Sequence, residues 1–349
     1  MKRGLADGVS WTDVLKLVAA ALALLALAIF GVPRIRAERW SLPGAAGSAR
    51  AQGGVAIQEY PVPSRSRPHD VAPASDGTVW YTAQATGELG RLDPVSGLTH
   101  HVKLGQGSAP HGVIAGPDGA AWVTDGGLNA IVRVDAHTET VDQFRLPGRG
   151  ANLNTAIFDD RGMLWFTGQA GVHGRLDPSI GEVELWQSPR GAGPYGITST
   201  PDGSVYFASL AGSYVGRIDR ESGGVAVLDP PTPRQGARRV WSDSQGQLWV
   251  SEWDGRNLAR YSPATSEWRE WRLPGSSPRP YAVYVDERDV VWLSDFSANA
   301  LVRFDPTTEA FDSFGIPSPN AQVRQLLGRP GEVWGAESGQ DKLIVIRFE

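Results

Sequence analysis

Polar side chains recur along this 349-residue chain at a nearly constant distance before a repeated aromatic residue. They supply imidazole, amide, phenol and guanidinium groups, which serve acid–base chemistry and anion binding. Six of them stand 11 residues before the aromatic residue, and the seventh stands 10 before it: His69, His111, Asn154, Tyr195, Arg238, Tyr281 and Arg324. This spacing predicts that a repeated structural unit brings all seven side chains to one place.

A second set follows the same aromatic residue by three positions and is rich in carboxylates. Its members are Ala83, Asp125, Gly168, Ser209, Glu252, Asp295 and Glu337. Carboxylate oxygens from separate units can hold a hard cation such as Mg²⁺ or Ca²⁺. The same acids can instead pair with Arg238, Arg279 and Arg324 in a structural ring of salt bridges, and the sequence leaves both interpretations open.

The repeated aromatic residue also predicts the fold that positions these groups. It recurs at steps of 41 to 43 residues, as Trp80, Trp122, Trp165, Tyr206, Trp249, Trp292 and Trp334. A period of about 40–45 residues is typical of a β-propeller with four strands in each blade. Helical patterning is absent after residue 32. We therefore expect an all-β, seven-bladed β-propeller over residues 56–349.

Within one repeat, four strands can be read at residues 110–115, 121–124, 130–135 and 140–144, with a tight Pro-Asp-Gly turn at 117–119. The first polar set opens the innermost strand, and the second set ends the antiparallel strand that follows. Both sets should therefore meet at the mouth of the central channel. We expect a small-molecule or peptide ligand to bind there.

The two ends of the propeller should join in one blade. The last repeat contains three strands and then the chain stops, whereas residues 56–63 match the fourth-strand pattern of the other repeats. We expect this N-terminal strand to complete the last blade, which hides sheet edges that would otherwise be open to aggregation.

The first 36 residues read as a membrane anchor or signal segment, and residues 37–55 as a flexible linker. Leu15 to Val32 is an almost unbroken apolar run behind Lys2 and Arg3, which predicts a single hydrophobic helix. We expect an uncleaved anchor and a periplasmic or extracellular propeller, with secretion after signal cleavage as the alternative. The chain has no cysteine, which excludes disulfides, thiolate chemistry and cysteine-based zinc sites.

Charge argues against one class of partner. Residues 52–349 contain 26 Lys and Arg against 35 Asp and Glu. An acidic surface repels polyanions, so we expect no nucleic acid partner. We expect the propeller to be a monomer.

The repeat sequences resemble those of one known family. Pro-His-Gly-Val at 110–113, Pro-Asp-Gly at 117–119 ahead of Trp122, and Gly-Arg-Leu-Asp-Pro at 90–94 and 174–178 resemble the virginiamycin B lyase family. The resemblance covers all seven repeats. It implies a seven-bladed propeller that acts as a lyase and confers antibiotic resistance. The implied reaction opens a cyclic depsipeptide by Mg²⁺-dependent elimination across an ester bond, and it does not consume water.

The same resemblance points to site residues in the last two blades, and three of the four are substituted. Tyr281 stands where the family has a His, and Arg324 stands where it has the catalytic His. Gln322 replaces one metal-binding Glu, while Glu337 matches the other. Arg stays protonated near neutral pH and is a poor base, so elimination at these positions is not expected.

A similar arrangement recurs two blades further round. There the resemblance implies His111 as general base, His69 assisting or binding substrate, and Asp125 holding a metal. One interpretation is therefore a metal-dependent lyase acting on a cyclic depsipeptide or lactone-like ester. The alternative is a non-catalytic propeller that binds a peptide, sugar or protein partner. A calcium-dependent lactonase is disfavoured by seven repeats in place of six.

Overall fold

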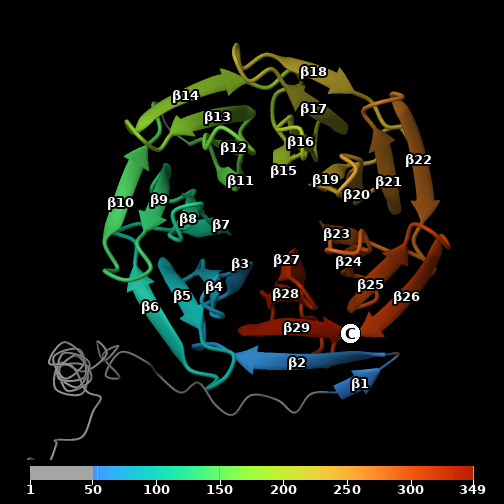
Figure 1. The fold of residues 1–349 in the computed structure, drawn as a ribbon, viewed down its shortest axis with the longest axis horizontal. Coiled ribbons are helices and arrows are strands. Elements are labelled where there is room, and N and C mark those ends of the chain that lie inside the picture. The colour runs from blue at the N-terminus through green and yellow to red at the C-terminus, as the bar shows by residue number, and fades with distance from the viewer. Residues whose placement is uncertain (1–49, 53, 149, 349) are drawn as a thin grey trace, which may run out of the picture. The chain divides into compact units, whose positions relative to one another are not determined.

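The computed structural model describes residues 50–52, 54–148 and 150–348, which form 29 β-strands. The strands make seven antiparallel sheets arranged in a ring (Figure 1), six with four strands and one with five. No helix occurs in this described part, so the prediction of an all-β, seven-bladed propeller is confirmed. The predicted hydrophobic helix and most of the predicted linker lie outside the described residues.

Each blade is a meander of neighbouring strands. Blades 1 to 4 contain β3 (Pro68–Pro73), β4 (Val79–Ala83), β5 (Glu88–Leu92) and β6 (Thr99–Lys103); β7 (Pro110–Ala115), β8 (Ala121–Asp125), β9 (Ala130–Val134) and β10 (Val141–Arg145); β11 (Leu153–Phe158), β12 (Leu164–Gly168), β13 (Val172–Asp177) and β14 (Glu182–Gln187); and β15 (Pro194–Ser199), β16 (Val205–Ser209), β17 (Tyr214–Ile218) and β18 (Val225–Leu228).

The remaining three blades repeat this order. They contain β19 (Ala237–Ser242), β20 (Leu248–Glu252), β21 (Asn257–Ser262) and β22 (Glu267–Arg272); β23 (Pro280–Val285), β24 (Val291–Asp295), β25 (Ala300–Asp305) and β26 (Ala310–Gly315); and β27 (Val323–Arg329), β28 (Glu332–Glu337) and β29 (Lys342–Phe348) with β1 (Arg50–Gln52) and β2 (Val55–Pro61).

The seventh blade combines strands from the two ends of the described chain. β2 pairs antiparallel with β29, from Val55 opposite Phe348 to Pro61 opposite Lys342. β1 adds to the outer edge of β2, inside the range expected to be a linker. A polar contact reinforces the join, because the Lys342 ammonium donates to a Glu59 carboxylate oxygen at 2.7 Å.

The repeated aromatic residue explains why every blade closes in the same way. All seven copies are at most 3% exposed. In four blades the indole Nε1 donates to a carboxylate of the preceding turn, from Trp122 to Asp118, Trp165 to Asp159, Trp249 to Asp243 and Trp292 to Asp286, at 2.9–3.0 Å. A buried indole N–H needs such an acceptor. The turn acid therefore fixes both the hairpin and the core residue.

The Gly-Arg-Leu-Asp pattern of the third strand also has a structural cause. A Cβ on Gly90 would lie 2.1 Å from the Tyr81 ring, so an aromatic residue of the neighbouring strand occupies the space a side chain would need. The Asp at the strand end accepts a backbone hydrogen bond two residues on, as Asp93 does from Val95 at 2.9 Å. This Asp therefore begins the turn that follows the third strand.

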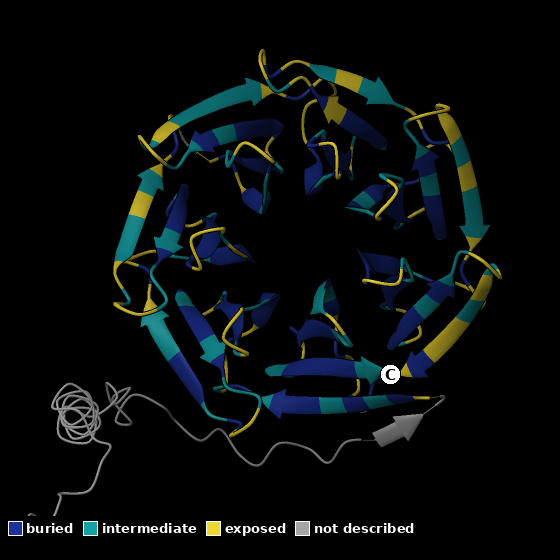
Figure 2. Ribbon diagram, in the orientation of Figure 1, coloured by how far each residue is buried: buried dark blue, intermediate teal, exposed yellow. Residues whose placement is uncertain are grey.

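Burial falls from the inside of the ring to the outside (Figure 2). The inner strands are mostly buried, and the fourth strands present half-buried and exposed residues. Among the described residues, no helix has the length and hydropathy that a membrane crossing requires.

Candidate functional site at the channel mouth

Each predicted mouth residue lies at a β-bulge at the start of an innermost strand. The pairing between the first and second strands shifts register in all seven blades: at residues 68–71, 110–112, 153–156, 194–197, 237–239, 280–283 and 323–326. These intervals contain His69, His111, Asn154, Tyr195, Arg238, Tyr281 and Arg324. A bulge re-aims a side chain and is common beside functional sites.

A hydroxyl residue two positions after the aromatic holds most of these bulges. It accepts a backbone N–H of its own blade's bulge and donates to a carbonyl of the next blade. Thr82, for example, accepts from Asp70 N at 3.0 Å and donates to His111 O at 2.8 Å. Thr124, Thr167, Ser251 and Ser294 act alike. The channel wall is therefore tied together from blade to blade, which fixes the mouth residues in position.

His69 and His111, predicted to act together, lie side by side. Their ring centroids are 3.8 Å apart. The Nδ1 atom of His69 lies 2.7 Å from Asp70 Oδ1. Since Asp70 also accepts from Arg239, it is best satisfied as a carboxylate, which assigns the His69 proton to Nδ1. No described residue hydrogen-bonds to His69 Nε2, so this nitrogen keeps a lone pair for a proton.

His111 is more fully engaged. Its Nδ1 lies 3.0 Å from the backbone carbonyl of Asn154, and its Nε2 lies 3.3 Å from Asn154 Nδ2. The Nδ1–H therefore donates to the carbonyl, and Nε2 accepts from the amide. Burial lowers the pKa of His111 well below its usual value, and proximity to His69 lowers it further. The structure favours His69 over His111 as the ring with a free nitrogen.

Arg239 crosses the channel and was missed by the sequence analysis. Its Nη2 lies 3.1 Å from Asp70 Oδ1, and its Nη1 donates to Thr155 Oγ1 at 3.0 Å. The guanidinium therefore joins blade 5 to blades 1 and 3. Both partners of this ion pair are buried, where breaking one side is costly.

The missed residues share one position, directly after a mouth residue. Asp70, Thr155, Arg239 and Gln325 all stand there. Gln325 Oε1 accepts from Val71 N at 2.9 Å, which again links blade 7 to blade 1. The sequence does carry a signal for them, because polar residues recur directly after the mouth residue, at a position where an innermost strand would otherwise have an apolar residue.

Aromatic and guanidinium groups stack on the opposite side of the mouth. The Arg238 guanidinium lies 3.5 Å from the centre of the Tyr281 ring and 4.8 Å from that of Trp253. The hydroxyls of Tyr195 and Tyr281 hydrogen-bond to each other, and Arg238 donates to Tyr195 at 3.2 Å. Burial raises the pKa of Tyr281, but Arg238 and Arg239 outweigh it and the net pKa is lowered. The phenol pair is therefore set in a positive environment.

Arg324 completes this positive group. Its Nη1 lies 3.4 Å from the Tyr281 hydroxyl, and its Nη2 donates to Gln322 at 3.0 Å. The Nε atoms of Arg238, Arg239 and Arg324 are buried and have no hydrogen-bond partner among the described residues. These three N–H groups are enclosed by protein, so a ligand at the mouth would meet the positive charge of the partly exposed Arg238 and Arg324, which suits an anion or a polarised carbonyl.

Two of the predicted carboxylates serve their own loops. Asp125 is fully buried and accepts from Ala109 N and Leu128 N at 2.9 Å, and from the Ser108 hydroxyl. Asp295 accepts from Arg279 N and Ser297 N at 2.9 Å. The structure groups His69 and His111 with Asp70 and leaves Asp125 in its loop.

Glu252 and Glu337 face other acids. Burial raises the pKa of Glu252 to about 8 with help from Glu270, and raises that of Glu337 to about 9 with help from Glu59. Both are therefore protonated at neutral pH. The alternative expectation of a salt-bridge ring with Arg238, Arg279 and Arg324 is wrong: Arg279 pairs with Asp254 at 2.9 Å.

The residues present do not fit a divalent cation at the positions that the resemblance implies. Burial and Glu59 raise the pKa of Glu337, which makes it a weaker cation ligand, and Gln322 contacts Arg324. The spacing of His69, Asp70 and His111 would suit a metal, with one ligand atom of each within 4.8 Å of the others. However, Asp70 already forms an ion pair with Arg239, and Arg238 and Arg324 add positive charge that repels a cation.

Comparisons with known proteins agree with this architecture. The chain is similar to the crystal structure of virginiamycin B lyase from Staphylococcus aureus, with a TM-score of 0.78 at 20% identity over 84% of this chain and 100% of that one. A streptogramin B lyase structure matches with a TM-score of 0.78 at 22% identity, over 84% and 98% of the two chains.

A more distant similarity reaches a different kind of protein. The extracellular domain of a putative one component system from B. thetaiotaomicron matches with a TM-score of 0.64 at 16% identity, over 80% of this chain and 40% of that one. No curated protein matches the chain.

The family comparison is the more specific of these findings. The family model described as "Virginiamycin B lyase family" matches residues 43–266, which is more than half of the sequence. This match includes the bulged strands that present His69, His111, Asn154, Tyr195 and Arg238. The chain belongs to the virginiamycin B lyase family.

Proposed function

We propose that the channel mouth binds a cyclic depsipeptide or lactone-like ester and opens it by elimination, with His69 as the general base. The observation that carries this proposal is the His69–Asp70 contact at 2.7 Å, which leaves Nε2 free. Burial lowers the pKa of His69 well below its usual value, and Arg239 and Arg324 lower it further. The imidazole is therefore neutral near pH 7, with Nε2 unprotonated.

The guanidinium groups supply the charge stabilisation. In an elimination of this type, His69 takes a proton from the carbon next to a carbonyl, and negative charge develops on that carbonyl oxygen. The ester carbon–oxygen bond then breaks, which leaves a double bond on one side and a carboxylate on the other. Arg238 and Arg324, which are partly exposed and positively charged, suit both the developing oxyanion and the released carboxylate.

This proposal differs from the expected use of Mg²⁺ or Ca²⁺. Bound at such a site, a divalent ion would polarise the carbonyl. Here the positive charge of three arginines takes that role, so we propose a metal-independent reaction. We also propose that the propeller is an exported monomer anchored through residues 15–32, with its ligand reaching the mouth from outside the cell.

A second candidate function is binding without turnover. It is favoured by the closed packing of the mouth, where His69 is 4% exposed and Tyr281 is 1% exposed. A ligand that contacts only the partly exposed Arg238 and Arg324 would be held but not converted. A peptide or sugar with a carboxylate fits such a surface.

One experiment separates the two functions. Purified residues 50–349 are incubated with a streptogramin B, with and without EDTA, and the product is examined by chromatography and fragmentation mass spectrometry. Elimination conserves mass, so a linear product appears as a new retention time and a linear fragmentation pattern. A linear product in the presence of EDTA supports the proposal. Unchanged antibiotic at high protein concentration contradicts turnover of this substrate.

A further inference from the structure

The two faces of the propeller carry opposite charge. The mouth face is formed by the loops that join one blade to the next and by the turns between second and third strands, on the side where the innermost strands begin. The charged residues among its described loops and turns are six Arg and three Asp: Arg65, Arg67, Arg190, Arg234, Arg256 and Arg279, and Asp229, Asp254 and Asp341. This face is therefore basic, although the chain has a net charge of −5.

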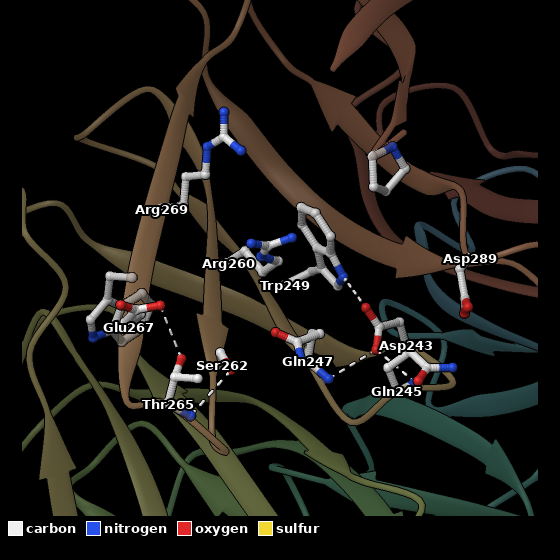
Figure 3. Close-up of a pocket in the computed structure, with 12 residues that line it drawn as sticks. Asp243, Gln245, Gln247, Trp249, Arg260, Ser262, Thr265, Glu267, Arg269 and Asp289 are labelled. Carbon is white, nitrogen blue, oxygen red and sulfur yellow. Dashed lines mark hydrogen bonds between the residues drawn. The ribbon is translucent and has the colours of Figure 1, made fainter. Parts of the chain in front are cut away.

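The opposite face is acidic. It is formed by the turns between first and second strands and between third and fourth strands, whose described residues include fifteen Asp and Glu against three Arg. Figure 3 shows part of this face, where Asp243 and Asp289 of two such turns line a cavity of about 760 Å³. The net negative charge of the protein therefore comes largely from the face that lies away from the channel mouth.

Four of the six arginines on the mouth face have no polar partner. Arg190 pairs with Asp229 at 2.7 Å, and Arg279 pairs with Asp254 at 2.9 Å. The other guanidinium groups make no hydrogen bond or ion pair with any described residue, and they belong to Arg65, Arg67, Arg234 and Arg256. Three of these side chains are exposed and that of Arg256 is half-buried, so their charge is available to a partner.

These four arginines also share an unfavourable backbone conformation. Their φ angles lie between 47° and 67°, in the left-handed region that favours Gly and Asn. Most other blades have those residues at the equivalent loop positions, four and two residues before the mouth residue: Gly107, Gly150, Gly191 and Asn320, and Asn152, Gly193 and Gly236. The turn position of Arg256 is Gly, Asn, Ser or Asp in the other six blades: Gly87, Asn129, Gly171, Ser213, Asn299 and Asp341.

Backbone strain of this kind concentrates where a side chain has a function. The loop that precedes blade 1 is held in its conformation by Asp341, whose carboxylate accepts from the backbone amides of Arg65 and Arg67, both at 2.7 Å. That carboxylate contacts the amides and leaves both guanidinium groups unpaired. The loop therefore presents two charges at a position where Gly or Asn would be less strained.

The spacing of the four arginines suits an extended partner. Arg65 and Arg67 precede blade 1, whereas Arg234 and Arg256 belong to blade 5, on the other side of the channel (Figure 1). One small anion cannot contact both pairs. Trp253, in the same turn as Arg256, is half-buried, and Trp side chains are enriched at the interface between membrane and water.

The direction of the chain favours a membrane as this partner. β2 ends at the mouth face and β1 runs antiparallel to it, so the chain enters the propeller from the mouth side. The apolar run at residues 15–32 lies 17 residues before β1, a length of chain that spans at most about 60 Å. We propose that the mouth face binds an anionic lipid bilayer through Arg65, Arg67, Arg234 and Arg256.

The consequence for the channel rests on the proposed function, whereas lipid binding does not. A mouth that faces the bilayer takes its ligand from the lipid surface, where amphipathic peptides accumulate. The test accordingly uses residues 50–349, without the apolar run and without a cyclic ester. Failure of lipid binding and failure of turnover are then separate results.

The first measurement is co-sedimentation with vesicles. We expect vesicles that contain phosphatidylglycerol to bind the protein at least ten-fold more tightly than vesicles of phosphatidylcholine alone. Binding should be lost in about 0.5 M NaCl, which screens charge interactions.

Two double variants test the arginines. Each guanidinium near an anionic surface strengthens binding about five-fold, so Arg65→Asn with Arg67→Asn, and Arg234→Asn with Arg256→Asn, should each weaken it at least ten-fold. Asn stands at the equivalent left-handed positions of other blades, so both variants should keep the parent melting temperature. The control, Arg161→Asn with Arg288→Asn, removes the same charge from the opposite face and should bind as the parent does.

A fluorescent label tests which face contacts the lipid. The chain has no cysteine, so a single introduced cysteine can carry an environment-sensitive dye. Ser277→Cys places the dye on the mouth face and Ala264→Cys on the opposite face, both at exposed positions. Anionic vesicles should change the emission of the first dye and leave that of the second unchanged.

Three results would overturn the proposal. Equal binding to the two kinds of vesicle, or no binding to either, would show that the face does not recognise anionic lipid. The same loss in the control variant as in the two mouth-face variants would show an effect of net charge alone. Binding of soluble dextran sulfate without binding of vesicles would show that the partner is an acidic polymer.

Discussion

Arg239 on β19 reaches across the channel to Asp70 on β3, with Nη2 of the guanidinium 3.1 Å from Oδ1 of the carboxylate. Both side chains are at most 4% exposed. Asp70→Asn leaves the guanidinium buried without its counter-charge, which costs about 3–5 kcal/mol of unfolding free energy. Urea unfolding followed by fluorescence measures this loss. Asp254→Asn, which removes an exposed pair with Arg279, is the control and should cost at most about 1 kcal/mol.

The role of His69 predicts a loss of turnover without a loss of fold. His69→Gln removes the basic nitrogen but retains an amide beside Asp70. If the protein converts a cyclic ester, this variant should fall to about the background rate, because a positioned general base contributes about 10²–10⁴-fold. His137→Gln, in an outer turn, should keep full activity. If His69→Gln keeps full turnover, another group must act as the general base.

The positively charged guanidinium groups at the mouth predict that the protein does not bind divalent cations there. Calorimetric titration with MgCl₂ or CaCl₂ should show no site with a dissociation constant below about 1 mM, the weak end of protein calcium sites. Positive charge from Arg238, Arg239 and Arg324 opposes such binding. A stoichiometric heat signal, or activity that EDTA abolishes, would restore the metal-dependent mechanism that the family resemblance implies.

The buried carboxyl of Glu252 predicts that stability falls as pH rises. Its pKa is about 8 in the folded protein, against about 4.5 in the unfolded chain. The folded state therefore keeps a proton that the unfolded state releases between these values, and stability decreases by about 1.4 kcal/mol per pH unit. Glu252→Gln removes this contribution, so it should gain stability relative to the parent at pH 7.5 and little at pH 5.

The control for this pH effect lies on the same blade. Glu267→Gln replaces an exposed acid of β22 and should leave the pH dependence of the melting temperature unchanged. Parallel curves for Glu252→Gln and the parent would show that Glu252 is ionised in the folded protein.

The pairing of β2 with β29 predicts that the N-terminal strand stabilises the ring. A chain beginning at residue 62 loses the antiparallel partner of β29 and exposes that strand as an edge. Compared with a chain beginning at residue 50, it should melt many degrees lower, since each kcal/mol corresponds to about 2–4 °C in a domain of 150–250 residues. Equal melting temperatures would mean that β2 contributes little to closure.

The sequence by itself determined the number of blades and the positions of the mouth residues. Each repeat has a buried aromatic residue at the same place in its blade, and in four blades a turn acid accepts its indole N–H, so a period of 41 to 43 residues is enough to count blades. The mouth position was equally predictable because it stands at a constant distance from that aromatic residue. The repeat pattern alone was therefore enough to predict the seven-bladed fold and the location of the channel mouth.

Only the tertiary structure decided which groups contact each other across the ring. Arg239 meets Asp70, and Glu337 meets Glu59, although the partners lie in distant parts of the sequence. The carboxylates three residues after the aromatic looked alike in sequence, yet Asp125 is held by loop amides while Glu252 faces Glu270. Such contacts depend on the closure of the ring, which brings blades together through space and leaves no periodic trace along the chain.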